Sequence, residues 1–366
     1  MNELTTVYLK DNELIKVNAR TSDLRDPACL VWTGSNIELN VKCSELYMLM
    51  EGPYDMYECR IAIEINGSVI SRFAISKEKQ WVQIFRMMNP DIETNVRVIK
   101  EVQLMPQDEH HCLNVYAVKL DGDILPVKEK NLKIEFIGDS ITSGEGTIGA
   151  KQDMDWISQY FAHTRSFPYF TGKILDADIR VFSQSGWGVY HSWDNNPTAA
   201  LPLYYEETAS LLNGEYFTNK GFKEKWDFNK WQPDYVIVNL GTNDDGAFHG
   251  MPYVDPVTGE KYNLCMDGDK YNSDDLEKVR KAMTDFILKI RKNNPGACII
   301  WAFGMVGDGM VPAIEKAIKE CGDDNTYFIK LDDTTDETVG SRCHPGIKAH
   351  LNAAEKISNW ILKNSK

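Results

Sequence analysis

The sequence predicts an α/β domain with a parallel sheet, preceded by an all-β sandwich domain. The chain has 366 residues, whereas an average domain needs ~100–200, so two domains are expected. The first third alternates apolar and polar residues, and the remainder alternates short apolar runs with helical segments. Because the pattern changes near residues 126–131, we expect one domain at 1–128 and a second at 129–366.

The first domain is predicted from alternation with a period of two residues, which is typical of strands with one buried face. The clearest runs are 37–41, 61–65, 96–99 and 115–120. Asn66-Gly67 and Asp121-Gly122 follow such runs, and these pairs supply the positive φ that tight hairpin turns require. No convincing amphipathic helix interrupts them, so an antiparallel β-sandwich is expected.

The second domain is predicted from apolar runs that alternate with helices, at 134–137, 179–182, 235–240, 299–303 and 327–331. The clearest helix begins near Ser273-Asp274 and stops at Asn294-Pro295-Gly296. A final helix is expected over about 347–362. Buried apolar strands separated by helices predict a parallel sheet covered by helices.

Composition excludes several classes of partner. Acidic residues outnumber basic ones by 54 to 40 and the formal net charge is −14, so nucleic acid and anionic membrane surfaces are disfavoured. The N-terminus has no signal-peptide core and no apolar run approaches the ~20 residues of a membrane span. We therefore expect a cytoplasmic protein, or a secreted one if a leader was removed.

The eight cysteines form no CxxC pair, so buried free thiols, no metal and no cofactor are expected.

Four short segments carry the residues suited to chemistry: 138–140, 185–188, 241–244 and 344–346. The first three follow predicted strands directly and the fourth follows the last strand and a loop. Parallel sheets bind ligands at the carboxyl edge of their strands, so these segments are expected to meet there. Acyl transfer needs a nucleophile, a base and donors for the oxyanion, and the four segments supply them.

Each role has a candidate residue. Ser140 lies between a strand and a helix start, where its hydroxyl can act as nucleophile and its N–H as an oxyanion donor. Gly186 can present a second N–H to a closely approaching carbonyl, and Asn243 can add a side-chain amide. His344 precedes Pro345, which holds the entry to the last helix, and is the best base available.

The strings IEFIGDSIT, SGWG, VNLGTND and CHPG resemble blocks I, II, III and V of the SGNH/GDSL hydrolase superfamily. That resemblance implies a three-layer α/β/α domain with Ser140 as nucleophile and His344 as base. It also implies an oxyanion hole of Ser140 N–H, Gly186 N–H and the Asn243 side chain. With the preceding jelly-roll-like sandwich, the chain further resembles carbohydrate esterase family 2, which deacetylates plant polysaccharides and oligosaccharides.

The chain departs from the superfamily at the third triad member. An Asp usually stands three positions before the catalytic His, and here that position is Ser341. One alternative is that a carboxylate from the preceding loop reaches Nδ1 of His344, with Asp333 the first candidate and Asp332 and Asp336 the others. The second alternative is that a main-chain carbonyl orients the ring and leaves a Ser–His dyad.

Substrate contacts are expected close to these segments. Trp187, beside the oxyanion glycine, is the first candidate for a sugar-stacking residue, and Asp139 and Asp244 are further candidates. The leading hypothesis is a serine esterase that removes O-acetyl groups from an acetylated carbohydrate of the xylan or mannan type. The alternatives are an SGNH thioesterase or lipid esterase, and a catalytically weak carbohydrate-binding protein. The sequence leaves the oligomeric state open.

Overall fold

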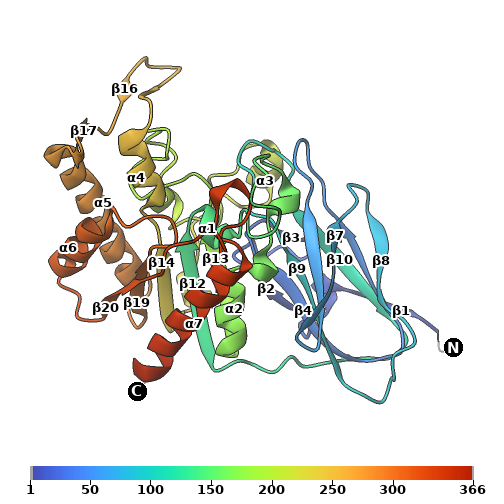
Figure 1. Cartoon of the computed structure of the whole chain (residues 1–366). Coiled ribbons are helices and arrows are strands. Elements are labelled where there is room, and N and C mark those ends of the chain that lie inside the picture. The colour runs from blue at the N-terminus through green and yellow to red at the C-terminus, as the bar shows by residue number, and fades with distance from the viewer. Residues whose placement is uncertain (1–2, 365–366) are drawn as a thin grey trace. The chain divides into compact units, whose positions relative to one another are not determined.

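The computed structural model describes residues 3–364, which divide into two compact units (Figure 1). The first unit runs to Glu129 and also includes two later segments, 157–164 and 207–226. The second unit holds 130–156, 165–206 and the chain from Asp227 onward. Each unit has its own hydrophobic core, as expected of a domain.

Two antiparallel sheets form the first unit. One has the order β1 (Thr5–Tyr8), β10 (Leu113–Leu120), β5 (Leu46–Glu51), β8 (Gln80–Phe85), with β3 (Ala28–Leu30) also on β10. The other has the order β11 (Asp123–Leu125), β4 (Asn36–Lys42), β9 (Thr94–Lys100), β6 (Arg60–Ile65), β7 (Ser68–Ala74), with β2 (Lys16–Asn18) on β4. This pairing confirms the predicted antiparallel sandwich.

The alternation seen in the sequence corresponds to an inward and an outward face. Strand β5 buries every second residue, and its buried side chains share one core with those of β4, β6, β9 and β10. The β6–β7 hairpin turns at Asn66 and Gly67, which have φ of 49° and 77°, as the Asn-Gly pair predicts.

Buried polar contacts connect the two later segments to the first unit. Glu101 is fully buried and accepts hydrogen bonds from the Thr164 N–H at 2.9 Å and from Arg72 Nε at 2.7 Å. The Trp32 indole N–H donates to the carbonyl oxygen of Thr208 at 3.0 Å. These contacts satisfy polar groups inside the unit and hold 157–164 and 207–226 in place.

A five-stranded parallel sheet forms the centre of the second unit. Its order is β13 (Ala177–Ser183), β12 (Leu132–Gly138), β14 (Tyr235–Asn239), β19 (Cys298–Phe303), β20 (Thr326–Lys330). All four neighbouring pairs are parallel. These strands correspond to the five apolar runs, so the predicted parallel α/β domain is confirmed.

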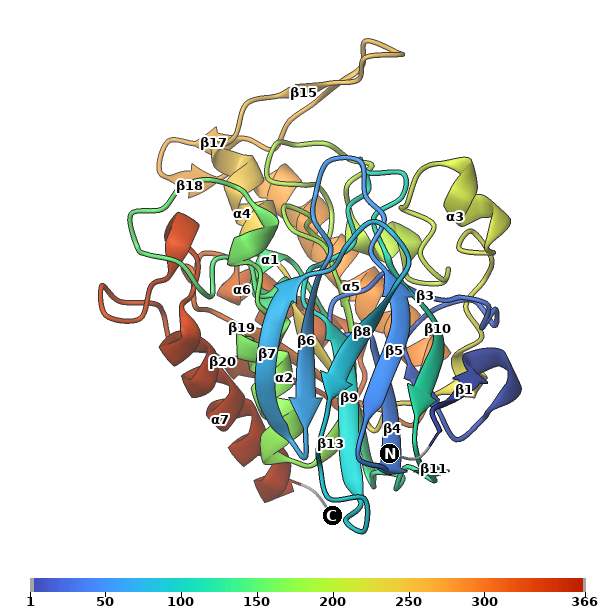
Figure 2. The ribbon, with the colours of Figure 1, turned by 90° about the vertical axis from the view of Figure 1, so that its right-hand side faces the viewer.

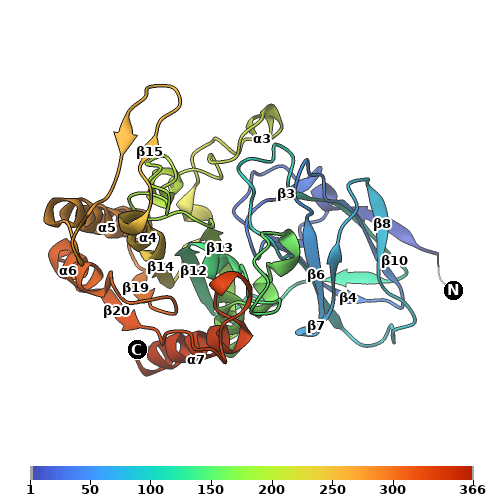
Figure 3. The same ribbon diagram turned by 45° about the horizontal axis from the view of Figure 1, so that its top comes forward.

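Helices cover both faces of this sheet (Figure 3). Helices α2 (Phe167–Ile174) and α7 (Ile347–Asn364) lie on one side, and α5 (Ser273–Asn293) and α6 (Val311–Cys321) lie on the other. The first pair packs its apolar side chains on the sheet. Helix α5 begins after Asn272, whose side chain accepts hydrogen bonds from the N–H groups of Asp274 and Asp275.

Shorter elements complete the chain. Helix α1 (Ser140–Ser143) follows β12, α4 (Thr242–His249) follows β14, and α3 (Glu215–Asn219) belongs to the first unit. Between α4 and α5 lie two small hairpins, which extend at the top of Figure 2: β15 (Tyr253–Val254) with β16 (Lys261–Tyr262), and β17 (Met266–Asp267) with β18 (Lys270–Tyr271). Within residues 3–364, every helix is too short or too polar to span a bilayer.

Candidate active site

Ser140 is the first residue of α1, directly after strand β12, which lies between β13 and β14 in the sheet, and a single connecting residue, Asp139. Asp139 caps the turn, because its Oδ1 accepts a hydrogen bond from the Ile141 N–H at 3.0 Å. Gly138 ends the strand, where an added Cβ would lie 2.0 Å from Thr142 Oγ1. Ser140 is 9% exposed and lies at the carboxyl edge of the sheet.

His344 contacts Ser140 across more than two hundred residues of sequence. Its Nε2 lies 2.9 Å from Ser140 Oγ, and its Nδ1 lies 2.8 Å from the carbonyl oxygen of Arg342. Because a carbonyl can only accept, the proton of the neutral ring is on Nδ1 and Nε2 is the acceptor for the Ser140 hydroxyl. This tautomer is the one that a general base needs.

The structure places the carbonyl of Arg342, not Asp333, at Nδ1 of His344. Asp333 is exposed, Asp332 pairs with Lys356 at 2.6 Å, and Asp336 pairs with Lys151. A ring nitrogen with one hydrogen already bonded to a carbonyl has no further donor for a carboxylate. The geometry therefore corresponds to the second alternative, in which a main-chain carbonyl orients the His344 ring.

The Arg342 carbonyl depends on an unusual backbone. Arg342 and Cys343 have φ of 55° and 57°. For a residue with a Cβ, this left-handed conformation costs roughly 1–2 kcal/mol of conformational free energy relative to the right-handed one. Neighbouring hydrogen bonds hold the segment: the Arg342 N–H donates to the carbonyl oxygen of Asp153 at 2.8 Å, and the Ser341 N–H donates to that of Gly146 at 2.9 Å. Strain that is held in this way is common where a site needs a fixed geometry.

Gly186 and Asn243, the other predicted oxyanion donors, follow β13 and β14. Gly186 has a φ of 80°, and an added Cβ would lie 3.1 Å from the Trp193 ring. Asn243 Nδ2 donates to Asp139 Oδ2 at 3.2 Å and to the carbonyl oxygen of Trp187 at 3.0 Å. Both hydrogens of this amide therefore have acceptors, and donation to an oxyanion requires that one be released or shared.

Two carboxylates predicted to contact substrate lie inside the site instead. Asp139 is 1% exposed and Asp244 is fully buried. Asp244 accepts hydrogen bonds from the N–H groups of Val189 and Tyr190. Burial raises the pKa of Asp139 to about 7, with the negative charges of Asp244 and Glu145 adding to the shift. Both carboxylates accept hydrogen bonds from the surrounding loops, and their contact with substrate stays a prediction.

Trp193 is the exposed aromatic residue of the site, and the sequence reasoning did not single it out. The residue is 59% exposed, its ring lies beside Gly186, and its main-chain N–H donates to the Gly186 carbonyl at 3.1 Å. Trp187, the first candidate, is half-buried and packs on Tyr204 with ring centroids 5.2 Å apart. The available signal was only the closeness of Trp193 to block II in sequence.

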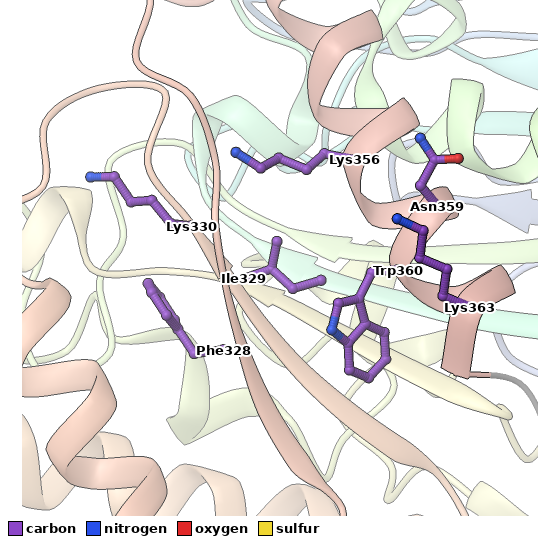
Figure 4. A pocket seen from close by; sticks show the side chains of 7 residues that line it. All are labelled: Phe328, Ile329, Lys330, Lys356, Asn359, Trp360 and Lys363. Atoms are coloured by element: carbon purple, nitrogen blue, oxygen red, sulfur yellow. The ribbon is translucent and has the colours of Figure 1, made fainter.

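A separate hollow of about 530 Å³ lies between β20 and the C-terminal half of α7 (Figure 4). Its lining residues are Phe328, Ile329, Lys330, Lys356, Asn359, Trp360 and Lys363. Two of its lysines already have acidic partners, Lys356 with Asp332 at 2.6 Å and Lys330 with Asp308 at 3.2 Å. The hollow contains neither Ser140 nor His344, so it is not part of their arrangement.

Among the described residues, no three His, Cys, Asp or Glu side chains are grouped to hold a metal ion.

Comparison with sequences of known proteins agrees with this geometry. Residues 136–354 match the GDSL-like lipase/acylhydrolase family. Cellulase/esterase CelE of Acetivibrio thermocellus is 24% identical over 369 residues, which cover 96% of this chain and 40% of that protein. An acetylxylan esterase / glucomannan deacetylase of Cellvibrio japonicus is 25% identical over 67% of this chain and 64% of its own length. The chain thus spans less than two thirds of these curated relatives.

Solved structures match the whole chain. An acetyl xylan esterase from the rumen bacterium Butyrivibrio proteoclasticus is 36% identical with a TM-score of 0.96, over 98% of both chains. A family two carbohydrate esterase from Clostridium thermocellum, in complex with cellohexaose, is 22% identical with a TM-score of 0.78, over 95% of this chain and 98% of that one. The second likeness supports the two-part fold.

Proposed function

The chain belongs to the GDSL-like lipase/acylhydrolase family, and from that premise we propose that it is a serine esterase that removes O-acetyl groups from plant polysaccharides or oligosaccharides. One observation carries the proposal: Ser140 Oγ and His344 Nε2 are 2.9 Å apart in a chain that is 36% identical, over nearly its full length, to an acetyl xylan esterase. The substrate is then an acetylated carbohydrate of the xylan or mannan type.

The proposed reaction has two steps. Ser140 Oγ attacks the carbonyl carbon of the acetyl ester while its proton passes to Nε2 of His344. The tetrahedral intermediate collapses when His344 gives this proton to the departing sugar oxygen, which leaves an acetyl group on Ser140. Water, deprotonated by His344, then attacks the acetyl-enzyme, and acetate leaves as Ser140 regains its proton.

The oxyanion of both intermediates needs preorganised donors. The N–H groups of Ser140 and Gly186 and the side-chain amide of Asn243 are proposed for this role. Asn243 must then exchange one of its present acceptors, Asp139 or the Trp187 carbonyl, for the oxyanion. Removing a single such donor typically costs ~10²–10³ in kcat.

A main-chain carbonyl serves here where many serine hydrolases use a carboxylate. The Arg342 carbonyl fixes the tautomer and the direction of the His344 ring, which are two of the tasks of a triad Asp. A carbonyl carries no full charge, so stabilisation of the imidazolium must come from elsewhere in the site.

Trp193 is proposed as the residue that stacks on a sugar ring next to the acetyl group. Support comes from its 59% exposure and its position beside Gly186, because an exposed indole offers a large apolar face at low entropic cost. Trp187, which is half-buried and packed on Tyr204, is proposed as a secondary contact to the sugar.

The test is release of acetate from acetylated xylan and mannan oligosaccharides, compared with hydrolysis of acetyl and octanoyl esters of one alcohol. Preference for acetyl groups on sugars is expected. A preference for octanoyl esters would replace the proposal with a lipid esterase or thioesterase. Sugar binding by calorimetry without any ester turnover would replace it with a binding protein.

A further inference from the structure

An ion pair lies against the proposed catalytic residues. Glu145 Oε1 accepts a hydrogen bond from Arg342 Nε at 2.9 Å and lies 3.9 Å from His344 Nε2. The side chain of Glu145 is 3% exposed, and that of Arg342 is 27% exposed. Burying a carboxylate is unfavourable unless a partner compensates, so this placement requires the guanidinium.

The main chain of Glu145 contacts the nucleophile turn. Its N–H donates to the carbonyl oxygen of Ser140 at 3.0 Å, two residues after α1 ends. Gly146 follows, and its carbonyl oxygen accepts the Ser341 N–H at 2.9 Å. Glu145 is therefore bound to the segment that carries Ser140 through its backbone and to the segment that carries His344 through its side chain.

Arg342 fixes the acceptor that orients the base. Its carbonyl receives the Nδ1 hydrogen of His344, and it does so with Arg342 in the left-handed region, with φ 55° and ψ 32°. The guanidinium is held by Glu145 and, through Nη1, by the carbonyl oxygen of Met154 at 2.7 Å. The side-chain contacts therefore restrain the same residue whose backbone conformation sets the direction of the carbonyl.

We propose that Glu145 and Arg342 act as a positioning pair for His344, an inference that rests on the proposed esterase function. Before the reaction, the pair holds the Arg342 carbonyl against Nδ1. When the Ser140 proton moves to Nε2, the Glu145 carboxylate is the charged group near the nitrogen that gains it. The stabilisation that a triad Asp provides at Nδ1 is thereby provided in part from the Nε2 side of the ring.

Three variants test the pair by steady-state hydrolysis of p-nitrophenyl acetate. Glu145→Gln is expected to lower kcat on the order of 10²-fold with KM changed little, because a small displacement of a base costs this much. Arg342→Gln is expected to do the same. Arg342→Lys restores a cation for Glu145 and is expected to recover part of kcat. The double variant E145Q/R342Q is expected to be no worse than the poorer single variant, because the two residues act as a unit.

A matched ion pair elsewhere in the same unit serves as the control. Arg291 Nη2 lies 2.8 Å from Asp323 Oδ2, with side chains 20% and 16% exposed, between α5 and the segment before β20. Asp323→Asn removes the carboxylate partner of Arg291, just as Glu145→Gln removes the carboxylate partner of Arg342. It is expected to lower the melting temperature while kcat per folded molecule stays at the wild-type value.

A second readout separates this inference from the proposed substrate. A fluorophosphonate probe labels an activated serine whatever ester the enzyme uses, so its rate of reaction with Ser140 reports positioning alone. If the wild type hydrolyses no acetyl ester, the proposed function fails but the labelling rates of the variants still decide the role of the pair.

The expected result is slower labelling of Ser140 in Glu145→Gln and Arg342→Gln, in step with the loss of kcat, and faster labelling in Arg342→Lys than in Arg342→Gln. Wild-type labelling and kcat in folded Glu145→Gln would overturn the proposal. If Glu145→Gln does not fold, Arg342→Gln decides in its place. Unchanged kcat in Arg342→Gln overturns the proposal. A loss of activity that is explained entirely by the unfolded fraction, which is the pattern expected of Asp323→Asn, overturns it as well.

Discussion

Asn243 donates a hydrogen bond to Asp139 at 3.2 Å, and Asp139 is the residue that immediately precedes the proposed nucleophile. The cap of the nucleophile turn and the proposed oxyanion amide are thus one connected unit. Asp139 uses Oδ1 for the Ile141 N–H and Oδ2 for Asn243, so both of its oxygens are engaged. The same carboxylate therefore orients two parts of the site.

Replacing Asn243 with Ala removes the proposed amide donor. We expect kcat to fall by ~10²–10³ with a smaller change in KM, since the amide acts on the intermediate more than on the bound ester. Asn359→Ala, at an exposed asparagine of α7, is the matched control. Steady-state kinetics with acetylated xylo-oligosaccharide measure both, and an Asn243→Ala enzyme with wild-type kcat would remove this residue from the oxyanion hole.

Gly146 lies where the segment after α1 closely approaches the segment that carries His344. It has a φ of 66°, and an added Cβ would lie 2.4 Å from the Ser341 carbonyl oxygen and 2.6 Å from His344 Cβ. Gly146→Ala must therefore displace the base, and kcat is expected to fall on the order of 10²-fold. Gly268→Ala is the control, because Gly268 has a φ of 64° with no atom within 4 Å of the added Cβ. Both variants bear the ~1–2 kcal/mol backbone strain, so only Gly146→Ala should lose turnover per folded molecule.

Trp193 is expected to contribute to sugar binding but not to the chemistry. Trp193→Ala should raise KM for acetylated oligosaccharides by roughly tenfold, which corresponds to about 1.4 kcal/mol of lost contact. Hydrolysis of p-nitrophenyl acetate, which has no sugar ring, should change little. Trp360→Ala, at the hollow beside α7, is the control. An equal loss on both substrates would show that Trp193 supports the site rather than binding the sugar.

Asp139 gives the stability of the protein a defined pH dependence. Its pKa is about 7 in the folded chain, above its ordinary value of 3.8, so the folded state binds a proton that the unfolded state releases between these values. Stability from this group is therefore greatest at low pH and is lost as pH rises toward 7.

The corresponding measurement is denaturant unfolding of the wild type and Asp139→Asn at pH 5 and pH 7.5. The free energy of unfolding of the variant, minus that of the wild type, should increase by roughly 1–3 kcal/mol between the two pH values, because an amide does not titrate. Asp244, whose pKa is also raised by burial, remains in both proteins, so the comparison reports the Asp139 carboxyl together with its charge interaction with Asp244. A difference that does not depend on pH would contradict the assignment.

Sequence patterns predict the architecture well where one physical rule dominates. The strands β14 and β19 are nearly continuous apolar runs, and β12, β13 and β20 are rich in apolar residues, because both faces of this parallel sheet are covered. The meeting of Ser140 and His344 follows from the rule that residues after parallel strands gather at one edge. Both features are local in sequence or fixed by topology.

The remaining features depend on contacts that leave no periodic signal. The left-handed conformation of Arg342 is unusual for a residue with a Cβ, and it is held by contacts from residues 145–154, almost two hundred positions earlier. Segments 157–164 and 207–226 join the first unit through scattered hydrogen bonds rather than through an amphipathic pattern. The burial of Asp139 and Asp244 likewise cannot be inferred from their place in the motifs.

The central claim is that Ser140, activated by His344, removes acetyl groups from a carbohydrate. The most direct measurement is the rate of acetate release from acetylated xylan and mannan oligosaccharides by the wild type and by Ser140→Ala, with both proteins shown to be folded by circular dichroism. We expect turnover by the wild type and a loss on the order of 10⁶-fold in the variant, as for other serine nucleophiles. Retention of acetate release by Ser140→Ala would contradict the account.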